Sequence, residues 1–268
     1  DVATKVVTGA SATLGTFAIL ELLPIPVVSV AISRDTATLV PQQSLQLTAT
    51  PKDQDGNALT NRTAAWSSSA PAVATVTSGG LVTAVAPGSA TITTSIDGKS
   101  ATAQVTVKDG GIVGAAGGLV GTSDGIAQVT FPVGALSTTQ PITIAPAANA
   151  PANTRLVPGT AFDFGPSQTF ATPVTMRLSY AGTVVPATTN ETLLRLHRLT
   201  NGAWVEVPGS SVDVASKTVT GLTGSFSTYA LLGLVPPQQV VITWDFGVSP
   251  ACSTLPTCGA LSKVEQVL

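Results

Sequence analysis

Apolar and polar residues alternate with a period of two along most of this 268-residue chain. In residues 101–108, Ala and Val occupy the odd positions and Thr, Gln and Lys the even ones. The same alternation recurs over residues 28–32, 45–49, 127–131 and 174–180. Half-buried β-strands produce this pattern, because successive side chains point to opposite faces of a sheet.

Clusters of turn-forming residues separate the expected strands. In the first part of the chain they lie at residues 53–57, 78–80, 87–88 and 97–98, and they are rich in Gly, Pro, Asp and Asn. Short antiparallel strands joined by such turns are most simply arranged as two packed sheets. The predicted fold class is therefore all-β, with tandem antiparallel β-sandwiches.

The composition excludes several classes of protein. Only 10% of residues are charged and the formal net charge is −2, against about 25% charged residues in an average domain. A chain without a basic block does not neutralise a run of phosphates, so nucleic acid is not an expected partner. The longest apolar stretch, residues 13–32, is interrupted by Glu21, Pro24 and Pro26, so membrane insertion as a helix is not expected either.

One segment of the chain occurs twice. Asp1–Leu20 aligns without gaps on Asp213–Leu232, and ten of the twenty positions are identical. The second copy closes a region of alternating strands, whereas the first copy has no such region before it. We therefore expect residues 1–20 to be either the closing hairpin of a preceding repeat or a pair of strands donated to a neighbouring module.

Residues 27–108 carry the blocks Trp-Ser-Ser, Val-Ala-Thr-Val, Gly-Leu-Val-Thr-Ala and Pro-Gly-Ser-Ala-Thr-Ile-Thr in that order. With these blocks the segment resembles a bacterial immunoglobulin-like (Ig-like) domain of group two. The resemblance implies an Ig-like sandwich that serves as an extracellular spacer or adhesin module, with nothing catalytic. It also gives Trp66 a packing role.

Residues 109–233 open with a Gly-rich stretch and the run Pro-Val-Gly-Ala-Leu, and they close with Gly-Ser-Phe-Ser-Thr-Tyr-Ala. With Asn-Gly-Ala-Trp at residues 201–204, these features resemble the bacterial relatives of the zonula-occludens and netrin-receptor (ZU-five) sandwich domain. The resemblance implies a second β-sandwich of a different type from the first.

Prolines mark the linkers between the expected domains, since Leu23-Pro24-Ile25-Pro26 follows the first copy of the repeat and Val235-Pro236-Pro237 follows the second. Proline stiffens the backbone on both sides of itself, so these linkers should act as spacers. The predicted organisation is a closing hairpin or donated strands (1–23), a linker (24–26), the Ig-like domain (27–108), the second sandwich (109–233), and a linker with the start of a further β module (234–268).

Catalytic groups are scarce in the sequence. Some relatives of the second domain cleave their own chain at a His-Phe-Ser step, but here the step is Ser225-Phe226-Ser227. We interpret it as a packed final strand. The single histidine, His197, shares its parity with Arg195 and alternates with Leu194 and Leu196. The pattern predicts a solvated strand face for His197, without the partners of a hydrolytic triad, so no catalytic residue is assigned.

Metal and cofactor sites find equally little support. Asp53 and Asp55 stand at alternate positions, as in calcium loops, but the following Gly56 comes too early and no glutamate closes a twelve-residue loop. The glycines of residues 111–121 are spaced G-x-x-G-x-x-G, which differs from the dinucleotide fingerprint. We interpret both segments as turns, and we expect neither a metal nor a cofactor.

Two further features concern the surface. Cys252 and Cys258 enclose five residues, and outside the cell the default for such a pair is a disulfide. Trp204 shares its parity with Glu206, whereas Val205 and Val207 have the other parity. The indole of Trp204 is therefore the candidate contact for a surface glycan.

These observations predict a secreted, extracellular or cell-surface structural protein, a stalk or filament-forming scaffold without catalysis. Its partners would be neighbouring β-sandwich modules or identical subunits placed end to end. The alternatives are an adhesin or carbohydrate-binding accessory module of a larger secreted protein, and a phage surface decoration. The chain starts at Asp1 without a basic leader, which is expected of a mature chain or an excised piece.

Overall fold

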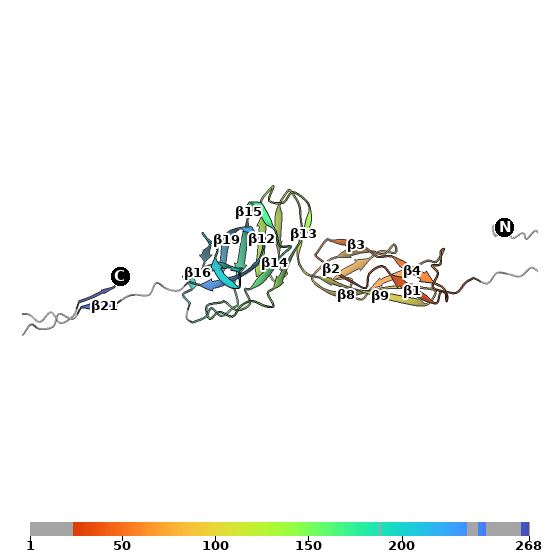
Figure 1. Ribbon diagram of the computed structural model, residues 1–268, viewed down its shortest axis with the longest axis horizontal. Coiled ribbons are helices and arrows are strands. Elements are labelled where there is room, and N and C mark those ends of the chain that lie inside the picture. Colours follow the sequence, from red (N-terminus) through yellow and green to blue (C-terminus); the bar gives the residue numbers. More distant parts are fainter. Residues whose placement is uncertain (1–23, 188, 235–240, 245–263, 268) are drawn as a thin grey trace, which may run out of the picture. The chain divides into compact units, whose positions relative to one another are not determined.

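The computed structural model describes residues 24–187, 189–234, 241–244 and 264–267. The chain divides into two compact units, Asp1–Val107 and Lys108–Leu268 (Figure 1). Strands make up nearly all the regular structure, and the one helix among the described residues is the short 3-10 turn η1 (Glu191–Leu193). The prediction of an all-β chain is confirmed.

The first unit holds strands β1 to β9. Its largest sheet has the order β2-β9-β8-β5, made of β2 (Thr36–Leu39), β9 (Lys99–Val107), β8 (Gly88–Ile96) and β5 (Ala65–Ser68). A second sheet has the order β3-β7-β6, made of β3 (Ser44–Gln46), β7 (Leu81–Ala84) and β6 (Ala74–Val76), while β1 (Ser29–Ile32) pairs with β4 (Ala49–Lys52). The ladders are antiparallel except that β2 runs parallel to β9.

The core of the first unit lies between these sheets. Val105 and Ile92 project from the larger sheet and are fully buried against Val82 and Leu47. The polar neighbours of Val105 along β9 face solvent, as the alternation predicts. Trp66 packs on the edge of this core, which agrees with the packing role implied for it.

The second unit consists of two larger sheets. The six-stranded sheet has the order β10-β13-β14-β20-β16-β17, made of β10 (Asp109–Val113), β13 (Gln140–Pro146), β14 (Phe162–Gly165), β20 (Thr228–Gly233), β16 (Leu194–Thr200) and β17 (Ala203–Glu206). The five-stranded sheet has the order β11-β12-β15-β19-β18, made of β11 (Gly118–Gly121), β12 (Ala127–Phe131), β15 (Thr169–Ser179), β19 (Thr218–Ser225) and β18 (Ser211–Asp213). All their ladders are antiparallel.

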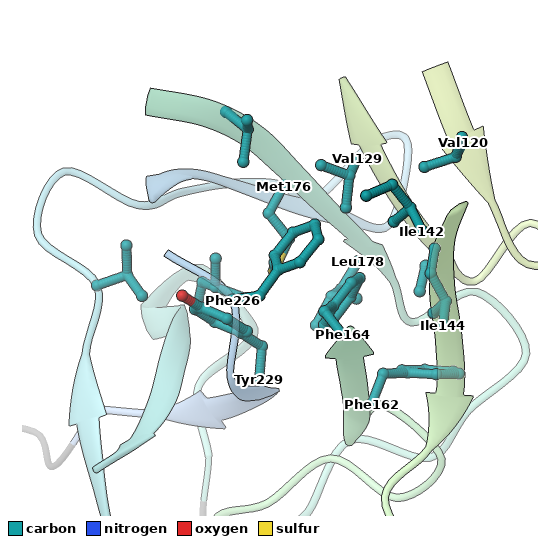
Figure 2. Close-up of a cluster of buried hydrophobic side chains, with 14 of the residues drawn as sticks. Val120, Val129, Ile142, Ile144, Phe162, Phe164, Met176, Leu178, Phe226 and Tyr229 are labelled. Carbon is teal, nitrogen blue, oxygen red and sulfur yellow. The ribbon is translucent and has the colours of Figure 1, made fainter. Parts of the chain in front are cut away.

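Aromatic rings fill the space between the two sheets of the second unit (Figure 2). Phe226 lies at their centre: its ring centroid is 4.8 Å from that of Phe170, 5.7 Å from that of Phe164 and 5.9 Å from that of Phe131. Most of these pairs meet edge to face, the geometry that the ring quadrupole favours. Since Phe226 lies between the end of β19 and the start of β20, the connection between the sheets is anchored in the core.

Beyond residue 234, the structure describes an antiparallel ribbon of β21 (Val241–Trp244) and β22 (Val264–Val267). The sequence predicts the start of a further β module within residues 234–268, and β21 lies in that range. Whether a further module starts in this region stays a prediction.

The position of Phe226 gives a test of the core. Phe226→Ala should lower the free energy of unfolding of the second unit by about 3 to 5 kcal/mol, because it removes a large buried ring and leaves a cavity. Leu222→Ala, on the neighbouring strand β19, is the control: its side chain is 61% exposed, and the change should stay within about 0.5 kcal/mol. Denaturant titration would measure both. Equal losses would contradict the assignment of the core.

Candidate functional sites

His197 lies inside the six-stranded sheet, where β16 runs between β20 and β17. It pairs with Ala230 on one side and Glu206 on the other. Its side chain is only 5% exposed, so the prediction of a solvated face was wrong. The sequence alternation correctly puts Leu194 and Leu196 in the core, but it does not reveal what covers the opposite face.

Residues 147–157 are hydrogen-bonded to both strands that flank β16, the strand of His197. Leu199 follows His197 on the same face of β16, and its cross-strand partner is Trp204. The indole Nε1 of Trp204 donates a hydrogen bond to the carbonyl of Pro151 at 3.1 Å. Arg155, four residues further on, donates from Nη1 to the carbonyl of Gly233 at 2.9 Å. These bonds tie the loop to β17 and β20, the two neighbours of β16 in the sheet.

The environment of His197 favours the neutral imidazole. Burial lowers its pKa, and the charge of Arg155 acts in the same direction, although the carbonyl of Arg195 and the carboxylate of Glu206 oppose the shift. Nδ1 lies 3.1 Å from the Arg195 carbonyl, which can only accept, so Nδ1 carries the proton. This geometry makes His197 a buried structural donor in the second unit.

The Ser225-Phe226-Ser227 step joins β19 to β20. Ser225 Oγ accepts a hydrogen bond from Arg198 Nη1 at 2.7 Å, and Ser227 Oγ donates to the carbonyl of Leu199 at 3.0 Å. Phe226 between them is buried. Both hydroxyls are therefore used to fix the connection. Phe226 is packed, as expected, but the step joins two strands and is not itself a final strand.

Tyr229 closes the same connection from the side of β20. Its hydroxyl lies 2.5 Å from Thr223 Oγ1 and donates to the carbonyl of Ser225 at 2.6 Å. Burial raises the pKa of Tyr229, so the phenol stays protonated and able to donate. The two partners offset the loss of water around this buried hydroxyl, and their bonds fix the crossing between the sheets.

Trp204 is half-buried, whereas the next residue, Val205, is 51% exposed. Val205 is therefore exposed, although its parity is that of the buried Val207. The indole N–H of Trp204 is used by Pro151, so the ring is held in place by the loop. Trp204 as a glycan contact stays a prediction, and so does the disulfide between Cys252 and Cys258, which lies outside the described residues.

Beside Val205 lies an open groove between the ends of β17 and β19, which the sequence did not indicate. Its volume is about 430 Å³, and its walls include Arg198, Val207 and the exposed Leu222. Arg198 donates a hydrogen bond to Ser225, so the groove combines a guanidinium group that already has a partner with apolar walls. Such a surface is not readable from strand alternation, because its two walls come from different sheets.

A second cluster missed from the sequence surrounds η1. Lys217 donates from Nζ to Glu191 Oε1 and lies 5.8 Å from the ring centroid of Tyr180. The hydrogen bond from Lys217 lowers the pKa of Glu191, while burial and the nearby Glu191 carboxylate raise the pKa of Tyr180. One signal was available: this lysine is identical in the repeat, where it is Lys5.

The turn at residues 53–57 uses its leading carboxylate internally. Asp53 Oδ1 accepts from the backbone N–H groups of Asp55 and Asn57 at 2.9 and 2.8 Å, and Oδ2 accepts from Asn57 Nδ2 at 3.2 Å. Although desolvation opposes it, this set of bonds lowers the pKa of Asp53. The geometry is that of a turn stabilised by its aspartate.

Two negative findings concern the described residues. No three His, Cys, Asp or Glu side chains there gather closely enough to hold a metal ion. Nor does the described part of the chain contain a helix of the length and hydrophobicity needed to cross a membrane.

Comparison with known proteins adds a family for the first unit. Residues 26–107 match the bacterial Ig-like domain (group 2). The Ig-like resemblance of residues 27–108 is thus confirmed, and that of residues 109–233 to the ZU-five domain stays a prediction. No curated protein matches the chain.

Solved structures give a looser likeness. Domains 5-6 of the S-layer protein SbsC are 17% identical, with 81% of this chain and 88% of that chain covered and a TM-score of 0.30. Domains 4-9 of surface layer protein SbsC are 19% identical, with 82% of this chain and 33% of that chain covered and a TM-score of 0.30. At this level of similarity the two structures carry no argument about function.

The burial of His197 predicts a pH-dependent stability of the second unit. The unfolded chain binds a proton on His197 below its ordinary pKa of about 6.5, whereas the folded unit resists protonation. The free energy of unfolding should therefore fall as the pH drops from 7 towards 5, by at most about 1.4 kcal/mol per pH unit.

His197→Asn is the matched variant, because its amide can donate from the position of Nδ1 without titrating. The variant should lose the slope between pH 7 and 5, whatever its stability at pH 7. Carboxylates with lowered pKa, such as Glu191 and Asp213, contribute at lower pH. A slope that persists in the variant would contradict the assignment, since the chain has no other histidine.

Proposed function

We propose that the protein is a secreted or cell-surface structural protein, in which β-sandwich units joined in series hold a load at a distance without catalysis. The family of residues 26–107 supports an Ig-like spacer module. The low charge of the chain fits a scaffold better than a partner of nucleic acid. The observation that carries the proposal is how the chain enters and leaves its sheets.

In the first unit, the strands near the two chain ends pair in parallel. The chain enters through β1, which pairs antiparallel with β4, and β2 follows as the second strand. β9 is the last strand before the exit, and the β2-β9 register runs from Thr36 opposite Gln104 to Leu39 opposite Val107. A pull on the two chain ends would drive parallel strands along their axes in opposite directions. All the hydrogen bonds of the ladder are then loaded together, which resists separation better than peeling them one by one.

The entry to this unit is also tied down. Ile25, within the proline linker, accepts a hydrogen bond at its carbonyl from Arg62 Nη2 at 2.8 Å. Arg62 also forms an ion pair with Asp97 at 2.9 Å. A pull on the linker is thereby passed to the turn between β8 and β9, where Asp97 lies.

In the second unit, the chain leaves through the interior strand β20. Its residues pair with β14 on one side and with β16 on the other. The backbone N–H of Val157 adds a bond to the carbonyl of Leu231 at 2.9 Å. The exit strand can therefore be pulled out only by breaking ladders on both of its sides.

The load-bearing role of β2 can be tested with a pair of proline variants. The Asp35 carbonyl accepts from the Gln104 N–H at 2.7 Å, so the alternation of the strand turns the N–H of Ala37 towards β9 and that of Thr38 away. Ala37→Pro removes an N–H donor from the β2-β9 ladder and leaves its carbonyl acceptor unpaired. Thr38→Pro removes an N–H group on the other side of β2, which is the edge of the sheet.

In force spectroscopy of the whole chain, Ala37→Pro should lower the unfolding force of the first unit, and its free energy of unfolding should fall by about 1 to 3 kcal/mol. Thr38→Pro should change the force much less. The event assigned to the second unit should stay unchanged in both variants. Equal effects of the two prolines would argue against a ladder that bears the load.

Surface display needs a test in the organism that encodes the chain. Antibodies against the second unit should label intact cells or their appendages in electron micrographs, and external protease should remove the label while a cytoplasmic marker persists. Labelling that requires lysis of the cells would contradict the proposal. Labelling confined to phage particles would favour the phage alternative instead.

A further inference from the structure

The second copy of the repeat has a special place in the fold. It begins at Asp213, the last residue of β18, and includes all of β19 and nearly all of β20. In the five-stranded sheet β19 lies between β15 and β18, and in the six-stranded sheet β20 lies between β14 and β16. The repeated segment thus supplies one interior strand to each sheet, together with the connection that crosses the core.

Residues that are buried in the second copy keep their apolar character in the first copy. The fully or nearly fully buried Val219, Phe226, Tyr229 and Leu231 correspond to Val7, Leu14, Phe17 and Ile19. The exposed Leu222 corresponds to the small Ala10. Apolar residues at these positions are required only where the side chains are buried in a core. The pattern in residues 1–20 therefore indicates a segment that packs into one.

Two glycines give a sharper comparison. A Cβ on Gly221 would lie 2.9 Å from Leu196 Cδ2 and 3.3 Å from Ser210 Cβ, and this position is also glycine in the first copy, as Gly9. A Cβ on Gly224 would meet no atom within 4 Å, and this position is alanine in the first copy, as Ala12. The first copy therefore keeps glycine at the crowded position and replaces it at the open one.

We propose that residues 1–20 bind, as its two closing strands, a β-sandwich of the same fold as residues 108–234, in the places that β19 and β20 take here. The partner is a unit whose own places are open, because the second unit of this chain already fills both of them. This proposal rests on the proposed function, since both describe sandwiches joined in series. It is tested on purified protein, whereas the cellular location of the protein is tested separately.

The register of the second unit fixes the expected contacts. Gly221 pairs with Met176, and Leu222 pairs with Thr175 on the solvent face. Bound residues 1–20 should therefore place Ala10 opposite the partner's equivalent of Thr175. Cβ atoms directly opposite each other in an antiparallel pair are about 4.5 to 5.5 Å apart, which is close enough for a disulfide after slight adjustment.

An acceptor with open places can be made from this chain. Residues 24–212 lack β19 and β20 and contain no cysteine. The acceptor, unfolded in denaturant, is diluted into buffer with the full 268-residue chain as donor, or with residues 21–268 as the control. We expect the full chain to rescue soluble acceptor in a stoichiometric complex and the control not to do so. Equal rescue by the two donors would overturn the proposal.

Two donor variants test the crowded and open positions. Gly9→Val in the full chain should abolish the rescue, whereas Ala12→Val, which adds similar bulk where Gly224 has free space, should preserve it.

A donor with Ala10→Cys should form a disulfide with an acceptor carrying Thr175→Cys. Ser11→Cys, whose side chain would point to the core, and the unchanged donor, which has only Cys252 and Cys258, should not. Rescue that is insensitive to Gly9→Val would overturn the proposal.

If the acceptor aggregates under all conditions, the sequence of residues 1–20 can instead be tested inside the second unit, in place of residues 213–232. Ten substitutions within the full chain convert residues 213–232 to the sequence of residues 1–20. The grafted unit should retain cooperative unfolding, with a lower midpoint because Leu replaces Phe226. Adding Gly221→Val to the graft should abolish the transition. A graft that does not fold would overturn the proposal, and none of these outcomes depends on where the protein is displayed.

Discussion

The second unit depends on one constraint. Its two large sheets are each completed by their last strand in the sequence, β19 in one and β20 in the other. Phe226 and Tyr229 lie where β19 crosses to β20, and both side chains are buried between the layers (Figure 2). The rings supply the apolar area that draws the sheets together, and the Tyr229 hydroxyl donates a hydrogen bond to the Ser225 carbonyl at the crossing. The interior ladders of both sheets therefore depend on the same few residues.

Few charges take part in this stability. The described residues form only three ion pairs, and each of them has partly exposed partners. Exposed pairs contribute little. Cross-strand hydroxyl contacts, such as Ser44 with Thr83 at 3.2 Å and Ser211 with Thr220 at 3.3 Å, take over part of that role on the sheet surfaces. The scarcity of Lys and Glu is thus consistent with strands decorated by Thr and Ser.

Strand alternation predicted the inward faces well, because burial on one side of a strand imposes a period of two. Val174, Met176 and Leu178 are all fully buried, as their shared parity indicates. The pattern was not sufficient for His197, which is buried although it alternates with the core residues Leu194 and Leu196. The segment around Pro151 and Arg155, which is bonded to both neighbours of β16, lies some forty residues earlier in the chain. Alternation also did not reveal the groove beside Val205, whose walls come from different sheets. Burial of a side chain by a segment distant in the sequence does not change the period-two pattern of the strand itself.

The order of the strands also has a consequence for folding. Until β20 is made, β14 and β16 present unpaired backbone to solvent, and until β19 is made, so does one side of β15. Open edges of this kind recruit any strand with a matching apolar pattern. β20 must find β14 across a separation of 65 to 67 residues, so these edges stay open until the last strands of the two sheets are made. The late closure that places β19 and β20 in the interior of the two sheets also leaves open strand edges while the unit folds.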